Sequence, residues 1–439
     1  MKLSETFFLT KFFIALEERG IQYAVLRNAE SLPASLNGSD IDMLVSNNDI
    51  AKVYRIISDV ALQYGGCIMG HMRAPHFQQI EILGKFADGW CGCCIDLFSG
   101  VYVKSVLPIV DESLLSLRVD NGKGVWTLPH DIGCYLGYVK ELLVGRKKSE
   151  RYLDGAKRVV DSNKDNILCS KKCRQFLRNV LSGGKTSAKI FTWLWMIEMA
   201  FYRPFFCIKN HICFIVSKIS RFVFPCGKMI VVMGTDGSGK TTILNEILPV
   251  IKSMNHQSTV VRHLKPDLLP PLGRFRGVKD RSGHVCTQPH ASNPSGFIGS
   301  FVRLAYLVCD YVLGYWLKVR FKIARTPIAY WIFDRYAYDM LIDPRRFRIK
   351  LPQWLIKIFV FFVPTPDLII CLGGDPEKIY ARKPETSLDE VHRQVSALKE
   401  FCSRNQNAVW IDTTSSIEKS ANEVLCMILK RLSRKGRFS

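Results

Sequence analysis

The sequence predicts an α/β protein in which a parallel-sheet domain at 228–439 follows an α+β domain at 1–165 and a helical linker at 166–227. Three observations support this division. After Lys228, short runs of β-branched and apolar residues alternate with helical patterns, as in a parallel sheet covered by helices. A glycine-rich turn joins the first of these strands to a helix. Between Cys169 and Lys228, basic and aromatic residues are interleaved, and Glu198 is the single acid.

The composition indicates an intracellular protein with an anionic partner. With 439 residues, 48% of them hydrophobic, the chain is long enough for two or three cores. Its 15 cysteines follow no secretory signal, because residues 1–20 carry charges and form an amphipathic helical pattern. The formal net charge of +22 indicates a nucleotide, a phosphorylated substrate, a nucleic acid or a membrane surface as partner.

No segment is expected to span a membrane. The apolar stretches 301–324 and 351–368 are both interrupted by charged residues, and the second also by prolines. We therefore expect a cytoplasmic protein, with contact at the inner face of an anionic membrane left open.

The first part of the chain carries a pair of carboxylates in a strand pattern. A helix is expected at 5–19 and strands at 22–26 and 40–45. The period of two places Asp40 and Asp42 on one face of the second strand. Two carboxylates held this way repel each other unless a cation lies between them, which indicates Mg²⁺. Asp96, in the apolar run 93–98, is a candidate third carboxylate, and Glu81 is a weaker one.

The run Gly38-Ser39-Asp40-Ile41-Asp42, with the later Asp96, resembles the nucleotidyltransferase fold of the DNA polymerase beta superfamily. The resemblance implies that Gly38 and Ser39 hold a triphosphate and that the three carboxylates bind metal ions. One departure is that the Gly-Ser turn lies directly beside the Asp pair, whereas the family usually separates them with a short helix. Two alternatives stay open, a domain that keeps this fold without the reaction and a solvated strand face.

The stretch 166–227 mixes basic and aromatic side chains on expected helices. This mixture suits a membrane surface or a nucleic-acid backbone. The alternative is a helical hairpin that buries its aromatic residues against both domains. The basic residues are Lys171, Lys172, Arg174, Arg178, Lys185, Lys189, Arg203, Lys209, Lys218 and Arg221.

A phosphate-binding loop is indicated at 234–242, between a buried strand and a helix. Glycines allow the backbone amides to curl around phosphate oxygens. Lys240 is expected near the β- and γ-phosphates of a nucleoside triphosphate, and the Thr241 hydroxyl on Mg²⁺. The expected nucleotide-binding residues are Gly234, Thr235, Asp236, Gly237, Ser238, Gly239, Lys240, Thr241 and Thr242.

The remaining strands of this domain are expected at 258–262, 329–333, 366–372 and 408–412, with helices at 301–325 and 378–399 and a long loop at 264–300. Asp334 follows the strand at 329–333. An acid at the carboxyl end of a buried strand is where such a loop needs a second ligand for Mg²⁺. Arg382, Lys383 and Arg393 are available to reach phosphates.

Four segments together resemble the thymidylate kinase family over about half of the chain: 234–242, Asp334-Arg335-Tyr336, 366–369 and Ala381-Arg382-Lys383 with Glu385. The resemblance implies a P-loop kinase in which Asp236 and Arg335 face the phosphate acceptor and Arg382 belongs to a closing lid. It also implies that Asp412 to Thr414 lie near the adenine. The segment 264–325 is larger than in the family, and Gly373-Gly374-Asp375 stands where a carboxylate at a strand end is usual. A fused nucleotidyltransferase-like domain is also similar to members of surface-glycan pathways, which implies a sugar or glycolipid acceptor.

The sequence therefore predicts a kinase that depends on ATP and Mg²⁺. Lys240, Asp334, Arg335 and Arg382 are its expected catalytic residues, and Thr241 and Asp334 hold the metal ion. Because a guanidinium suits a phosphate, Arg335 favours an acceptor that is already phosphorylated over one that offers only a neutral hydroxyl. A nucleic-acid partner is not expected. Two alternatives stay open: a nucleotidyltransferase that acts through Asp40, Asp42 and Asp96, and a module that binds membrane or nucleic acid and is switched by a nucleotide.

Overall fold

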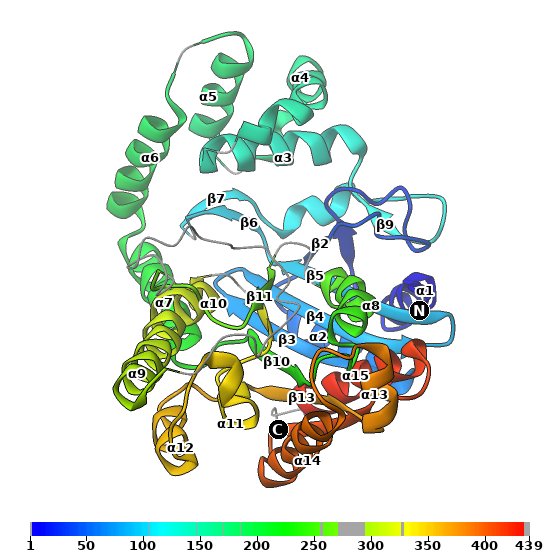
Figure 1. Ribbon diagram of the computed structural model, residues 1–439. Coiled ribbons are helices and arrows are strands. Elements are labelled where there is room, and N and C mark those ends of the chain that lie inside the picture. The colour runs from blue at the N-terminus through cyan, green and yellow to red at the C-terminus, as the bar shows by residue number, and fades with distance from the viewer. Residues whose placement is uncertain are drawn as a thin grey trace. The chain divides into compact units, whose positions relative to one another are not determined.

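The computed structural model describes residues 2–104, 106–145, 147–168, 170–184, 186–254, 258–270, 295–325 and 329–433. The chain divides into two compact units (Figure 1). The first unit runs essentially from Lys2 to Ser220, and the second continues from Arg221.

The first unit is built on a mixed seven-stranded sheet with the order β3-β4-β5-β2-β1-β9-β8. The central strand β2 pairs in parallel with β5 and antiparallel with β1. All five residues of β2 are buried, because helices α1 and α2 pack their apolar side chains against one face of the sheet. The elements are α1 (Thr6–Glu18), β1 (Tyr23–Val25), β2 (Ile41–Val45), α2 (Ile50–Gln63), β3 (Gly66–Ala74), β4 (Phe77–Phe86), β5 (Gly89–Phe98), β6 (Val101–Val103), β7 (Leu107–Val110), β8 (Val119–Asp120) and β9 (Trp126–Thr127).

Five helices follow, and α3, α4 and α5 lie together in Figure 1. They are α3 (His130–Val144), α4 (Leu153–Asp161), α5 (Lys171–Leu181), α6 (Ala188–Tyr202) and α7 (Pro204–Val223). Phe176 and Leu177 of α5 and Trp195 of α6 are buried in one cluster with Tyr135 and Leu136 of α3. The stretch expected as a separate linker therefore contributes to the core of the first unit, and the compact unit extends well beyond residue 165.

The second unit contains a five-stranded sheet with the order β11-β12-β10-β13-β14, in which every pair is parallel. This confirms the expected α/β class, a parallel sheet covered by helices. Its strands are β10 (Lys228–Gly234), β11 (Thr259–His263), β12 (Tyr330–Asp334), β13 (Leu368–Gly373) and β14 (Ala408–Asp412). Because β10 occupies the centre, the loop that follows it is flanked by the carboxyl ends of β12 and β13, the position at which open α/β sheets bind ligands.

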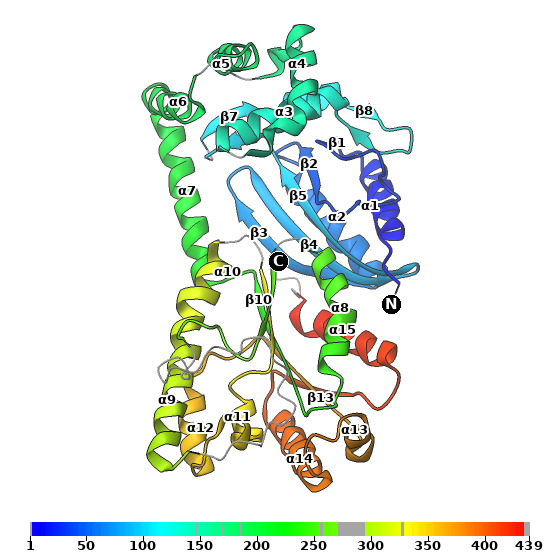
Figure 2. The ribbon, with the colours of Figure 1, turned by 45° about the horizontal axis from the view of Figure 1, so that its top comes forward.

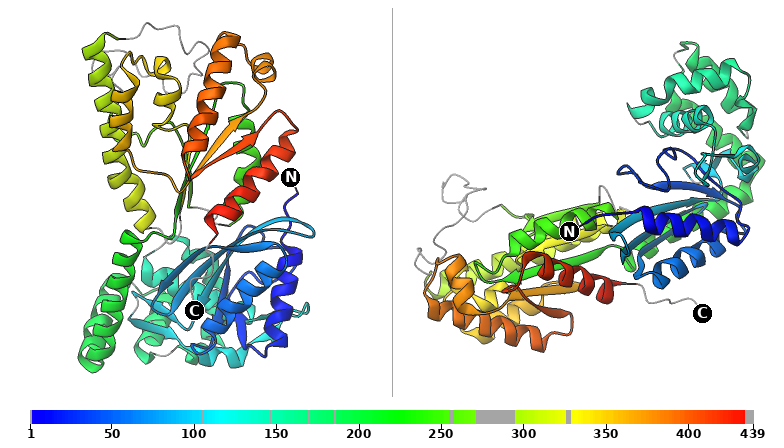
Figure 3. Two further views of the ribbon diagram at one scale, coloured as in Figure 1. Left: turned by 90° about the horizontal axis from the view of Figure 1, so that it is seen from below. Right: turned by 90° about the vertical axis from the view of Figure 1, so that its right-hand side faces the viewer.

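Helices cover both faces of this sheet. Buried side chains of α9, α11, α12 and α14 pack in one cluster with residues of β10, β12 and β13. Figures 2 and 3 show α8 and α15 on the other side of the sheet from α9 and α12. The helices are α8 (Lys240–Ser253), α9 (Phe297–Gly314), α10 (Phe321–Arg325), α11 (Asp339–Ile342), α12 (Gln353–Phe361), α13 (Pro376–Arg382), α14 (Leu388–Arg404) and α15 (Ile417–Leu432). A π-helical segment, Tyr315–Arg320, joins α9 to α10.

The single helix expected at 378–399 was wrong, because the chain forms α13 and α14 with a break between them. Lys383 precedes a proline, and its φ of −157° and ψ of 88° lie outside the helical region, which a residue before proline avoids. Ser387 then caps α14 by accepting a hydrogen bond from the Glu390 amide at 3.3 Å. The break places the segment 383–387 beside the P-loop, as described below.

The long apolar helix near 301–325 also differs from the expectation. Helical structure is continuous over Phe297–Ile323, which has 27 residues and a mean hydropathy of 1.5 in its most apolar window, a third of it buried. By length and composition alone, this helix could cross a membrane, which the charged residues in the stretch had argued against. Most of the long loop expected before it, 271–294, lies outside the described residues.

Candidate functional site

The loop between β10 and α8 has a backbone that only glycine accommodates well. Gly237 and Gly239 have φ values of +83° and +81°, in the left-handed region. A Cβ atom on Gly237 would lie 2.6 Å from the Ile379 carbonyl oxygen, and one on Gly234 would lie 2.6 Å from that of Leu372. The loop is therefore held tightly between the ends of its neighbours, and it opens at the N-terminus of α8, where backbone amides favour an anion.

Lys240 is buried inside this loop. Its ammonium donates hydrogen bonds to the carbonyl oxygens of Gly234 at 2.9 Å and Thr235 at 2.7 Å, and the residue is only 8% exposed. Burial lowers the pKa of Lys240 to about 7, with the charge of Arg335 adding to the effect and that of Asp236 opposing it. Within the described part of the chain, the buried hydroxyls of Thr235 and Ser238 have no hydrogen-bond partner. An anion bound here would satisfy all of these groups.

Asp236 is the acid at the centre of the loop, and two arginines bind it. Arg335 donates to one carboxylate oxygen, and Arg346 donates to the other. Burial alone would raise the pKa of Asp236, but the charges of Arg335, Lys240 and Arg346 outweigh it and lower the pKa to about 2. Asp236 is therefore an ionised link between the P-loop and the segment after β12.

Arg335 is more enclosed than the sequence indicated. Its second terminal nitrogen donates to Asp339 at 3.2 Å, so the guanidinium lies between two carboxylates and is 6% exposed. Its φ of +72° places a non-glycine residue in the left-handed region, which costs on the order of 1 kcal/mol. The contacts that hold this conformation are made by Asp236 and Asp339, so the direct contact with an acceptor assigned to Arg335 stays a prediction.

Asp334 lies at the carboxyl end of β12, whose register pairs it with Val232 in β10. One of its carboxylate oxygens is 3.3 Å from Nδ1 of His263, and the other is buried without a hydrogen-bond partner among the described residues. Burial alone would raise the pKa of Asp334, but the hydrogen bond from His263 and the charge of Lys240 lower it. Thr241 is exposed in the first turn of α8. A buried, ionised carboxylate oxygen that has no hydrogen-bond partner among the described residues fits a cation that prefers oxygen ligands, such as Mg²⁺. The Thr241 hydroxyl as a second ligand of that cation stays a prediction.

Segment 383–387 and helix α13 pack against the loop. The closest atoms to a Cβ on Gly237 belong to Ile379 and, at 3.3 Å, to the side chain of Lys383. Arg382, at the end of α13, is exposed, as a lid residue would need to be. The lid role of Arg382 stays a prediction.

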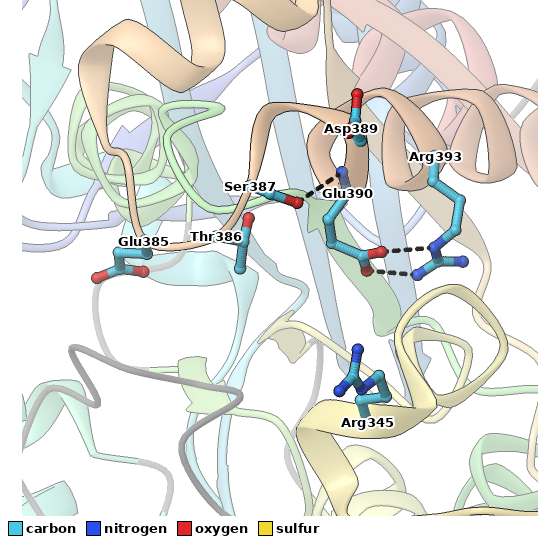
Figure 4. Close-up of a pocket in the computed structure, with 7 residues that line it drawn as sticks. All are labelled: Arg345, Glu385, Thr386, Ser387, Asp389, Glu390 and Arg393. Atoms are coloured by element: carbon cyan, nitrogen blue, oxygen red, sulfur yellow. Dashed lines mark hydrogen bonds and ion pairs between the residues drawn. The ribbon is translucent and has the colours of Figure 1, made fainter.

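A polar cavity of about 430 Å³ lies beside this segment (Figure 4). Its lining residues are all polar or charged: Arg345, Glu385, Thr386, Ser387, Asp389, Glu390 and Arg393. Glu390 and Arg393 form a two-pronged ion pair at 2.6 and 2.8 Å, and Figure 4 shows Arg345 reaching toward this pair from the short helix Pro344–Phe347. No ion pair or hydrogen bond of the Arg345 side chain is found among the described residues. Arg345 is therefore the cationic group of the cavity that is available to a ligand.

Three residues of this site were not predicted: Arg346, Asp339 and His263. Asp339 follows Arg335 by four residues, a spacing that could have indicated an ion pair within one turn. Arg346 and His263 carry no comparable local signal, because their partners are distant in the sequence. The Asp412-to-Thr414 segment, expected near an adenine, is tied to the end of β13, since the Thr413 amide donates to the Gly373 carbonyl at 2.8 Å.

The carboxylates of the first unit are brought together by its sheet. Asp42 and Asp96 are paired residues on the parallel strands β2 and β5, and Asp40 directly precedes β2. Burial raises the pKa of Asp96 well above its usual value, and the charges of Asp42 and Asp40 raise it further, against the charge of Lys140. The close approach of these three carboxylates therefore disfavours the ionised form of Asp96.

The guanidinium group of Arg27 neutralises part of this negative charge. Nε of Arg27 donates to Asp42, and its terminal nitrogen donates to the Tyr152 hydroxyl at 3.0 Å. Over the described ranges, no group of three or more His, Cys, Asp or Glu residues is arranged to hold a metal ion. The assignment of Asp40 and Asp42 as metal ligands stays a prediction. Gly38, with a φ of +69°, and Ser39, whose hydroxyl donates to the Leu36 carbonyl at 2.9 Å, form the expected turn.

Comparison with known proteins gives only distant similarity. No family model and no curated protein matches the sequence. The thymidylate kinase of Ehrlichia chaffeensis is a similar structure, with 17% identity and a TM-score of 0.31 over 46% of this chain and 98% of that chain. The thymidylate kinase of Candida albicans is similar with 15% identity and a TM-score of 0.34, over 46% of this chain and 91% of that chain. At these values the similarity says nothing about substrate or activity.

Proposed function

We propose that the second unit is a kinase that uses ATP and Mg²⁺ to phosphorylate an anionic acceptor. The observation that carries this proposal is the buried ammonium of Lys240, which lacks a full anionic partner. The nearest carboxylate oxygen, on Asp236, is 3.9 Å away and already accepts from Arg335. Burial and the charge of Arg335 disfavour the charged form of Lys240 and lower its pKa, and a triphosphate held by the loop amides would supply a negative charge that favours the ammonium.

The residues of the loop then have distinct tasks. Lys240 stabilises charge on the transferring phosphoryl group, and the unpartnered hydroxyls of Thr235 and Ser238 complete the polar lining. Thr241 and Asp334 would hold Mg²⁺, which neutralises the phosphate oxygens when it is bound. Arg382, which is exposed at the end of α13, would approach the nucleotide as part of a closing lid.

The polar cavity is the proposed acceptor site, because both of its walls continue into residues that touch the P-loop. Arg346, next to Arg345, binds Asp236, and Lys383, two residues before Glu385, contacts Gly237. The candidate acceptors that the sequence indicates are a nucleoside monophosphate, a sugar phosphate and a glycolipid. The lining contains no aromatic or aliphatic residue on which a base could stack. A sugar phosphate, with hydroxyls for the acids and an anion for Arg345, fits best.

The test uses ATP that is labelled at either the γ- or the α-phosphate. Each form is incubated with purified protein and a panel of sugar phosphates and nucleoside monophosphates, and the product that carries the label is identified. We expect the γ-phosphoryl group to appear on an acceptor in the wild type and in Asp42→Asn, and not in Lys240→Ala. Loss of an electrostatic contact of this kind costs about a hundredfold or more in rate. Unchanged transfer by a folded Lys240→Ala protein would exclude a kinase at this loop.

The carboxylates of the first unit favour a second candidate, a nucleotidyltransferase. The supporting observation is the raised pKa of Asp96 beside Asp42 and Asp40, a charge arrangement that a bound cation would relieve. In this case label from the α-position of ATP would appear on an acceptor, Asp96→Asn would remove it, and Lys240→Ala would retain it. Lys240→Ala therefore separates the two candidates, because it removes transfer by the first and retains transfer by the second.

A further inference from the structure

Helix α7 exposes its apolar stripe and turns a more polar stripe toward its own unit. Six large apolar residues recur at alternating spacings of three and four, which places them on one side of the helix, and each is between 43% and 87% exposed. They are Phe205, Ile208, Ile212, Ile215, Ile219 and Phe222. A helix that covered a core would show the opposite arrangement, so this stripe is available to a partner.

Contacts within the first unit fix this orientation. Cys207 and Asn210 on the opposite side of α7 are 7% and 6% exposed. The Ser217 hydroxyl donates to the Arg73 carbonyl at 2.7 Å, and the ring of Phe206 lies 6.5 Å from that of His76. These contacts hold the helix against the β3–β4 hairpin, and turning the apolar stripe inward would break them.

Helix α6 extends the exposed surface. Its exposed residues include aromatic and aliphatic side chains: Trp193, Leu194, Ile197, Phe201 and Tyr202. The expected alternative of a hairpin that buries its aromatic residues is wrong for these positions, because Phe201 and Tyr202 are 81% and 79% exposed. Large apolar side chains that are exposed on two consecutive helices are typical of an interaction site.

The charges beside the stripe identify the partner. Helix α7 carries the exposed residues Lys209 and Lys218 on the two flanks of this stripe, and it contains no acid. The single acid of α6, Glu198, is paired with Lys172 at 2.7 Å. Two copies of this face would bring like charges together without the complementary pairs that specify helix pairing. An anionic lipid surface instead matches both the basic residues and the exposed aromatic side chains.

We propose that the α6–α7 face binds the surface of an anionic membrane, with α7 lying in the plane of the interface. The second unit also exposes large apolar side chains on helices, since Ile298 on α9 and Phe361 on α12 are 78% and 82% exposed. The one acid of α9, Asp310, is fully buried and is bound by Lys265 at 2.7 Å. The surface lies outside the candidate kinase site, so the proposal does not depend on the proposed function.

Vesicle flotation of the full-length protein tests the proposal. We expect the wild type to float with phosphatidylcholine vesicles that contain about 30% phosphatidylglycerol, and to remain in the lower fraction with phosphatidylcholine alone. Flotation should fall when salt rises from about 50 mM to about 500 mM, because the charge attraction is screened. A wild-type protein that stays in the lower fraction at low salt overturns the proposal.

Two variants separate the apolar and the basic contributions. The combined change of Ile212→Ser and Ile219→Ser should lower partitioning at least about tenfold, since each removes buried apolar area in the bound state. The combined change of Lys209→Gln and Lys218→Gln should lower it about fivefold for each lysine. Leu62→Ser is the matched control, because it also replaces an exposed aliphatic side chain with serine but lies on α2, where Leu62 is 65% exposed. This variant should float as the wild type does.

Exposed substitutions should leave the thermal unfolding curve unchanged, which separates lost binding from lost folding. Wild-type flotation by both α7 double variants would overturn the proposal. Sedimentation provides the other decisive outcome. If the wild type is a dimer that does not float with vesicles, and the combined change of Ile212→Ser and Ile219→Ser makes it a monomer, the face binds a second copy of the chain instead of a membrane. Ile298→Ser with Phe361→Ser measures the face of the second unit separately.

Discussion

Replacing Lys240 with methionine is expected to abolish phosphoryl transfer and, at the same time, to stabilise the second unit near neutral pH. Burial and the charge of Arg335 lower the pKa of Lys240 from its ordinary 10.5 to about 7. This fall corresponds to about 5 kcal/mol of unfavourable interaction with the ammonium ion. Replacing a buried charge with an apolar side chain of similar length commonly recovers about 1–4 kcal/mol.

The sign of the pH dependence follows from the same pKa. Between pH about 7 and 10.5, the unfolded chain keeps the proton on Lys240 more than the folded chain does. The free energy of unfolding therefore rises with pH across this window, and below pH 7 the full cost of the buried ammonium is present. Lys240→Met should remove this contribution and should gain most at pH about 6.

Urea unfolding at pH about 6 and about 9 measures both effects. Addition of ATP to the wild type identifies the transition of the second unit, because a bound ligand stabilises only the unit that holds it. Lys252→Met, at an exposed lysine of the same helix, is the control and should change neither midpoint. A Lys240→Met protein that is less stable than the wild type at pH about 6, or that keeps the wild-type pH dependence, would refute the reasoning.

Three further changes test neighbouring groups. Gly237→Ala should destabilise the second unit by about 1–3 kcal/mol more than Gly122→Ala destabilises the first. The φ values of Gly237 and Gly122 are similar, +83° and +79°, but only a Cβ atom on Gly237 would meet a carbonyl oxygen. Equal losses of stability in urea unfolding would contradict this close contact. Asp334→Asn should raise the Mg²⁺ concentration needed for half-maximal turnover at least about tenfold, as measured by metal titration, and an unchanged titration would remove Asp334 from the metal site. Arg335→Lys removes the guanidinium group that bridges Asp236 and Asp339. Steady-state kinetics should show a raised KM for the acceptor and a nearly unchanged KM for ATP. A variant that raises only the KM for ATP would contradict this role of Arg335.

The sequence by itself determined the class of the second unit and the position of its loop. The four strands with expected ranges lie within two residues of them, and Gly237 and Gly239 take the left-handed conformation that the loop requires. These features depend on short-range signals, the run of apolar residues that forms a buried strand and the left-handed backbone that glycine permits. The break between α13 and α14 is also encoded locally, by Pro384.

Only the tertiary structure decided which partners the charged side chains take. Asp236 meets Arg335 and Arg346, which are 99 and 110 residues away, and Arg27 meets Asp42 on a neighbouring strand. The outward orientation of the α7 stripe was decided in the same way. Its spacing shows which residues share a side of the helix, but contacts such as that of Ser217 with Arg73, 144 residues away, determine which side faces the protein. Periodicity is a property of the local chain, whereas the choice of partner depends on which segments the fold brings together.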